Sequence, residues 1–266
     1  MICGPPARSS GRISWPAGIR VPLLLARGRV CGRGEHGCLI QAMGIRVVAV
    51  DVGSVGPPSK FGWAAYDVPA REVLMSGDDP QTAVSALVAG LAWGGQAVLL
   101  LESPLSVPVP AGDEEGWRLL GKARAGEGNR PWSASAGAGA LATGLAQGAW
   151  MLGQLAAAVP GLSATTQPDS WRSGVARLLL AEAFVSGSGK PVPVSASQHA
   201  ADAAAAGLAL VELLDGPEPL TSALHCSPHG PFNLLTAMAL WAGLSIDPSE
   251  LRADVLVIAG RPQPRQ

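Results

Sequence analysis

Two acidic residues interrupt apolar runs that we predict to be buried strands. Asp51 lies near the carboxyl end of the run 45–52, and Glu102 directly follows the run 98–101. If these strands are parallel neighbours, the two carboxylates lie side by side at one edge of the sheet. Buried carboxylates this close repel each other unless a cation lies between them. The pair therefore indicates a site for Mg²⁺ or Mn²⁺, which prefer oxygen ligands and accept substrate phosphates as well.

A third candidate acid, Asp202, lies at the start of an Ala-rich predicted helix, three residues after His199. This spacing places both side chains on one helical face, and the first turn of a helix favours an anionic ligand. Acids and polar residues are also common at helix starts without any function. Together with Asp51 and Glu102, however, His199 and Asp202 are candidates for a third element of one catalytic site.

Glu182 is a fourth candidate acid, since it interrupts an otherwise apolar stretch, 178–185. An acid in so apolar a strand either faces the site or pairs with a buried base. We include Glu182 among the catalytic candidates and leave both interpretations open.

Four residues are candidates for substrate binding. Arg130 could hold a phosphate through two hydrogen bonds, and Trp132 could stack on a base. The alternative is a loop anchor, with Trp132 buried and Arg130 paired with one of the acids at 113–115. Lys60 and Lys190 lie in predicted loops beside strands that lead to the site, where each is either a substrate contact or a solvated charge.

The elements that must position these residues follow from periodicity. Near-continuous apolar runs predict strands, and apolar residues at helical spacing predict helices. The predicted strands are 45–52, 61–67, 72–76, 97–101, 175–185 and 254–259, and the predicted helices are 80–93, 138–159, 198–214 and 234–244. Pro- and Gly-rich residues up to about 129 predict a long loop or lid, so that 104–160 reads as a loop and helical insertion.

The order of these elements predicts an α/β fold of the RNase H-like kind. Three strands joined by short turns predict an antiparallel meander, and the later strands, separated by helices, predict parallel pairing, with helices flanking the mixed sheet. A doubly wound dinucleotide-binding fold would place a helix directly after the first strand. From residue 43 onward neither GxGxxG nor GxxxxGK[ST] occurs, so those phosphate-binding loops have no support in this part of the chain.

Composition divides the chain near residue 42. Residues 1–42 carry six Arg against one Glu, whereas the remainder carries 13 Lys and Arg against 19 Asp and Glu. The first segment predicts a disordered or non-native extension, and 43–266 predicts the domain. The acidic balance of the domain argues against an avid, non-specific nucleic-acid binder. A single Cys in 43–266, and no apolar run long enough for a membrane span, predict a cytoplasmic protein without membrane contact.

The acidic motifs resemble those of a known superfamily. Asp51-Val52-Gly53, Glu102 and the stretch from His199 to Ala203 are similar to motifs of RNase H-like nucleases, including the Holliday-junction resolvases. The stretches 61–64 and 182–184 resemble the DUF429-type branch. The resemblance spans 45 to about 215 and implies two-metal hydrolysis of a phosphodiester, with nucleic acid or another phosphodiester as the partner. It also implies that Asp51, Glu102 and Asp202 are the metal ligands, and that His199 is a ligand or helps to handle protons.

Two other functions stay open. The fold could serve as a non-catalytic binding or scaffold protein, which metal affinity would distinguish. An actin-like ATPase is a sister branch of the same core, and Asp51-Val52-Gly53-Ser54 could be its first phosphate loop. That branch needs a second Asp-x-Gly loop in a duplicated domain, and no such repeat follows residue 104.

Overall fold

The β-branched run at the start of the predicted domain forms a central strand of a mixed sheet. The computed structural model describes residues 44–110, 116–128, 131–185, 197–226 and 229–260. Residues Leu39–Gln266 group as one compact unit. The extension expected at 1–42 lies outside the described residues.

The main sheet combines antiparallel and parallel pairing. Its strands run in the order β3-β2-β1-β4-β7-β6, and β9 pairs with β7. The first two pairings, β1–β2 and β2–β3, are antiparallel, whereas β4 pairs in parallel with β1 and β7, and β7 pairs in parallel with β6 and β9. The prediction of an α/β mixed sheet, antiparallel first and parallel later, is confirmed. The strands are β1 Ile45–Asp51, β2 Gly62–Val68, β3 Met75–Gly77, β4 Gln96–Glu102, β6 Ala164–Thr165, β7 Leu178–Phe184 and β9 Val257–Ala259.

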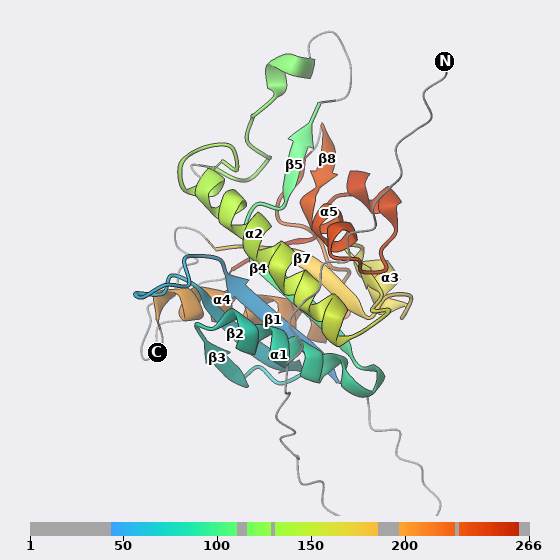
Figure 1. Cartoon of the computed structure of the whole chain (residues 1–266). Helices are drawn as coiled ribbons and strands as arrows, with labels where there is room; N and C mark the ends of the chain where they lie inside the picture. The colour runs from blue at the N-terminus through green and yellow to red at the C-terminus, as the bar shows by residue number, and fades with distance from the viewer. Residues whose placement is uncertain (1–43, 111–115, 129–130, 186–196, 227–228, 261–266) are drawn as a thin grey trace, which may run out of the picture. The chain divides into compact units, whose positions relative to one another are not determined.

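Helices cover both faces of this sheet, which explains why its central strands are apolar along most of their length. Alternate residues of β1 enter different cores: Val48 and Val50 pack with helices α1, α2 and α5, and Val47 and Ala49 pack with helix α4. In Figure 1, α1 and α2 lie in front of the sheet and α4 lies behind it. The helices are α1 Pro80–Leu91, α2 Ser135–Ala158, α3 Pro168–Arg172, α4 Gln198–Asp215 and α5 Leu234–Trp241.

Side-chain caps fix where several helices begin. Asp79 accepts hydrogen bonds from the N–H groups of Gln81 and Thr82, and Pro80 occupies the first turn of α1. Ser197 accepts from the N–H of Ala200 at the start of α4. Such caps satisfy backbone donors that the helix itself leaves without partners. The cap at Ser197 thus sets the first turn of α4, which carries the candidate residues of the site.

Several short elements were not predicted. The region expected to be a loop or lid contains β5 Ser106–Val109, which pairs with β8 Gly230–Asn233 in a separate two-stranded sheet, and the 3₁₀ helix η2 Gly116–Leu119. Helix α2 is longer than predicted and contributes Met151, Leu152 and Leu155 to the core. The described residues also form the 3₁₀ helices η1 Ala92–Gly94 and η4 Pro248–Arg252.

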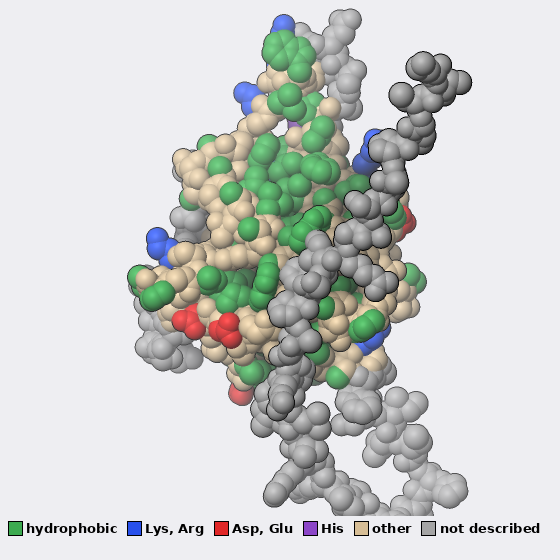
Figure 2. Space-filling view, viewed as in Figure 1, with side chains coloured by type: hydrophobic (Ala, Val, Ile, Leu, Met, Phe, Trp, Pro, Cys, Tyr) green, Lys and Arg blue, Asp and Glu red, His purple; other side chains and the backbone are tan. Residues whose placement is uncertain are grey.

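The face that carries α2 and α5 keeps apolar side chains on its surface. Trp150 of α2 is 39% exposed and Trp241 of α5 is 71% exposed. Figure 2 shows hydrophobic side chains gathered on this face. Among the described residues, no helix is long and apolar enough to cross a membrane.

Candidate metal centre

Three carboxylates meet at the carboxyl ends of the central strands. Asp51, Glu102 and Asp202 each offer one oxygen, and these oxygens all lie within 4.8 Å of one another. Asp202 is 1% exposed, whereas Asp51 and Glu102 are half-buried. The structure therefore brings together the three acids that the sequence predicted as ligands. Such a group of oxygen donors suits a hard divalent cation.

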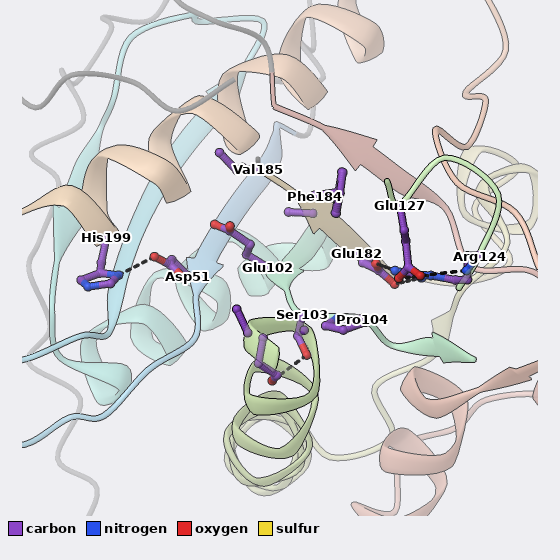
Figure 3. A pocket seen from close by; sticks show the side chains of 14 residues that line it. Asp51, Glu102, Ser103, Pro104, Arg124, Glu127, Glu182, Phe184, Val185 and His199 are labelled. Atoms are coloured by element: carbon purple, nitrogen blue, oxygen red, sulfur yellow. Dashed lines mark hydrogen bonds and ion pairs between the residues drawn. The ribbon is translucent and has the colours of Figure 1, made fainter. Parts of the chain in front are cut away.

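Strand pairing explains how the first two acids come together. In the parallel register of β1 and β4, Asp51 lies opposite Glu102, and each ends its strand. Residues directly opposite each other in a sheet point to the same face. Both carboxylates consequently point to the side of the sheet that α4 covers. Figure 3 shows them at the ends of their two strands.

The third acid depends on how closely α4 packs on the sheet. Gly62, the register partner of Asp51 in β2, lies directly under the first turn of α4. A Cβ atom at Gly62 would meet the backbone of Ala200 and would lie 2.7 Å from the His199 carbonyl oxygen. Only glycine permits this approach, which brings Asp202 within reach of the strand ends. Gln198 Nε2 then donates to Asp202 Oδ1 at 2.7 Å.

His199 contacts the trio through Asp51. Its Nδ1 lies 2.6 Å from Asp51 Oδ2, in a hydrogen bond that the imidazole donates (Figure 3). The His199 side chain is 33% exposed and that of Asp51 is 13% exposed. An imidazole bonded to a carboxylate in this way fixes the orientation of the carboxylate. The structure therefore places His199 beside a candidate ligand.

Glu182 belongs to a different group. Both of its oxygens accept from the guanidinium of Arg124, at 2.7 and 2.8 Å, and Oε2 also accepts from the N–H of Leu105. Arg124 Nε donates to Glu127 Oε1 at 2.9 Å. Side chains of all three charged residues are buried. Of the two interpretations of Glu182, the pairing with a buried base is the one that the structure bears out.

Register explains why Glu182 does not join the trio. Glu182 lies opposite Leu101 in the parallel pairing of β4 and β7. Its partner in β4 is therefore the residue before Glu102. Because side chains alternate between faces along a strand, this shift of one residue turns Glu182 to the face opposite Glu102. Sequence alone could suggest a buried base for Glu182, but nothing in the Gly-rich loop marked Arg124 or Glu127 as that partner.

Arg124 keeps its positive charge within this buried group. Burial on its own would lower the pKa of Arg124, but the attraction and hydrogen bonds of Glu182 and then Glu127 outweigh it and raise that pKa. The guanidinium thus stays protonated and neutralises part of the acidic charge beside the trio.

One pocket of about 190 Å³ adjoins both charged groups. Asp51, Glu102 and His199 line one part of it, and Arg124, Glu127 and Glu182 line another. The remaining lining is mostly small or apolar: Ser103, Pro104, Ala136, Gly137, Ala140, Ala183, Phe184 and Val185. A ligand in this pocket can contact Asp51 and Glu102 while its uncharged part lies against the start of α2 and the end of β7.

The structure describes two of the four predicted substrate-binding residues, Lys60 and Trp132. The Trp132 N–H donates to Glu127 Oε1 at 3.2 Å, and Trp132 Nε1 donates to the Lys122 carbonyl at 2.8 Å. These bonds favour the loop-anchor interpretation of Trp132, which is half-buried. Lys60 has an exposed side chain, and its role stays a prediction. Arg130 and Lys190 lie outside the described residues.

Comparisons of the chain with protein-family models, with curated proteins and with solved structures found no match.

Proposed function

We propose that this domain is a divalent-metal-dependent phosphodiesterase or nuclease with an RNase H-like fold. The observation that carries the proposal is the meeting of Asp51, Glu102 and Asp202, whose oxygens lie within 4.8 Å of one another. Three acids from two neighbouring strands and a helix, gathered beside a pocket, are the arrangement expected of a cation site. The mixed sheet, antiparallel first and parallel later, supports the choice of fold.

The donors of the trio fit Mg²⁺ or Mn²⁺. Carboxylates this close together are costly to keep ionised without a cation, and both metals prefer oxygen ligands. The donors are carboxylates alone, whereas zinc sites usually include Cys or His. When bound, such a cation would activate a water molecule and stabilise negative charge on a phosphate.

The other residues of the pocket orient a candidate metal ligand, limit the negative charge and keep water from one wall. His199 holds one oxygen of Asp51, which leaves the orientation of that carboxylate fixed before a ligand arrives. The Arg124–Glu182 pair closes the pocket on its other side and limits the negative charge that an anionic substrate meets. The apolar lining from α2 and β7 excludes water from one wall.

A phosphodiesterase assay with Mn²⁺ or Mg²⁺ tests the proposal. The substrates are bis(4-nitrophenyl) phosphate and a set of single-stranded, duplex and branched oligonucleotides. Asp202→Asn, which keeps the shape of the side chain, is expected to abolish metal-dependent hydrolysis. The matched control is Asp215→Asn on the same helix, where the acid forms an exposed ion pair with Arg71. Equal hydrolysis by wild type and Asp202→Asn would overturn the proposal, as would hydrolysis unaffected by EDTA.

A further inference from the structure

Helix α2 is hydrogen-bonded to both turns that follow the strand-end acids. Gln147 Nε2 donates to the Gly53 carbonyl, and Gln147 Oε1 accepts from the Gly53 N–H at 3.2 Å. Nearer the start of the helix, the Ala140 carbonyl accepts from the Ser103 hydroxyl at 3.0 Å. Gly53 is the second residue after Asp51, and Ser103 directly follows Glu102. One helix therefore contacts the two segments that set the positions of two of the three acids.

The contacts of α2 with Gly53 and Ser103 lie just beyond the last paired residues of β1 and β4. The parallel ladder of β1 and β4 ends at the pair Asp51 and Glu102. Gln147 meets Gly53 beyond that end with a reciprocal pair of bonds, much as a neighbouring strand would. The amide of a glutamine is suited to this task because it carries a donor and an acceptor side by side.

Close packing makes this arrangement specific to the local sequence. Gly144 lies between the two contacts on α2, and a Cβ atom there would lie 2.5 Å from the Ser103 Cβ. Glycine at this position lets the helix approach the end of β4 closely enough for both bonds to form. The start of the same helix lines the pocket with Ala136, Gly137 and Ala140. Helix α2 thus links the pocket wall to the turns of Asp51 and Glu102.

We propose that Gln147 is a positioning residue of the metal centre, holding the Asp51 turn at the separation from Glu102 that a shared cation requires. This inference rests on the proposed function. Gln147 is not among the described residues that line the pocket, so it acts through Asp51. Groups that orient metal ligands in this way typically change metal affinity by about 10- to 100-fold when they are removed.

The test is titration calorimetry of the full chain with MnCl₂. Gln147→Leu has a similar volume but neither donor nor acceptor, and it is expected to weaken Mn²⁺ binding about tenfold. The EPR spectrum of the bound Mn²⁺ is also expected to change, because the ligands around the ion are no longer held in the same geometry. The matched control is Gln154→Leu, seven residues later on the same face of α2 and also half-buried, which should bind Mn²⁺ like the wild type.

The outcomes separate this inference from the proposed function. If the wild type binds Mn²⁺ and Gln147→Leu binds it equally well, the positioning role is wrong while the metal centre stands. If the wild type binds no Mn²⁺, the proposed function fails and this inference with it. Melting in EDTA shows whether each variant is folded. Should Gln147→Leu not fold, Gln147→Met takes its place, with the same expected loss of about tenfold in affinity. An unchanged affinity of that variant would overturn the proposal.

Discussion

Replacing Gly62 by alanine should damage the metal centre although Gly62 itself supplies no ligand atom. The new Cβ would lie 2.7 Å from the His199 carbonyl oxygen and closer still to the backbone of Ala200. Ordinary van der Waals contact begins at 3.4 Å, and backbone atoms cannot turn aside as a flexible side chain can. The first turn of α4 must therefore move away from β2 by about 1 Å, because protein interiors are close-packed.

This displacement has two measurable consequences. Overpacking of this kind typically costs about 1–3 kcal/mol, which corresponds to a fall in Tm of roughly 2–12 °C for a domain of this size. Moving His199 and Asp202 away from Asp51 should also weaken Mn²⁺ binding, by about 10- to 100-fold, the loss that is typical when the groups orienting a metal ligand are disturbed. Thermal melting in EDTA measures the first effect and titration calorimetry the second.

A second glycine provides the matched control. Gly153 lies inside α2, and a Cβ atom there would meet nothing within 4 Å. Gly153→Ala should therefore raise stability by about 0.5–1 kcal/mol and leave Mn²⁺ binding unchanged. At position 62, alanine would suit the strand better than glycine if there were no clash, so a loss of stability there points to the clash. An unchanged or higher Tm for Gly62→Ala, with wild-type Mn²⁺ affinity, would refute the argument that Gly62 sets the distance between α4 and the sheet.

Three further predictions concern the framework of the site. Arg124→Met leaves Glu182 and Glu127 buried without their counter-charge, and it should lower the free energy of unfolding in urea by about 3–5 kcal/mol. Adding Glu182→Leu should recover at least about 1 kcal/mol. Simple additivity of the two changes would contradict the pairing. Asp79→Ala removes the cap of α1 and should lower stability by about 1 kcal/mol, whereas Asp79→Asn should retain most of it; equal losses would speak against the cap. Tyr66 is the only tyrosine of the chain, and burial raises its pKa to about 12, so its phenolate absorbance should appear near pH 12 in the folded protein; a midpoint near 10 would be inconsistent with its burial. Because folding raises this pKa, the contribution of neutral Tyr66 to the free energy of unfolding is complete below about pH 10. It is lost as the pH rises towards 12.

Most of the sheet could be predicted because burial on both faces leaves a strong signal in the sequence. The apolar runs of β1, β4 and β7 could be recognised as strands, and a single acid at the end of β1 and of β4 was conspicuous against them. Parallel pairing of neighbouring strands was enough to place Asp51 beside Glu102. The start of α4 was marked by its Ala-rich composition, and the spacing of His199 and Asp202 predicted that both face one way.

The parts that could not be predicted depend on contacts between distant segments. Strands β5 and β8 are four residues each and pair across more than a hundred residues, so neither has a local pattern to reveal it. The face to which Glu182 points depends on a register shift of one residue. Its partner Arg124 lies in a loop whose composition resembles that of any exposed turn. The role of Gly62 follows from tertiary packing alone.

Mn²⁺ binding to the full chain, measured by titration calorimetry for the wild type and for Asp51→Asn, tests the central claim most directly. The wild type is expected to bind Mn²⁺, and Asp51→Asn to lose that binding, because an amide removes the negative charge that the trio contributes there. Asp215→Asn, outside the trio, should bind like the wild type. Absence of Mn²⁺ binding by the wild type, or equal binding by Asp51→Asn, would contradict the account and leave the domain as an α/β scaffold.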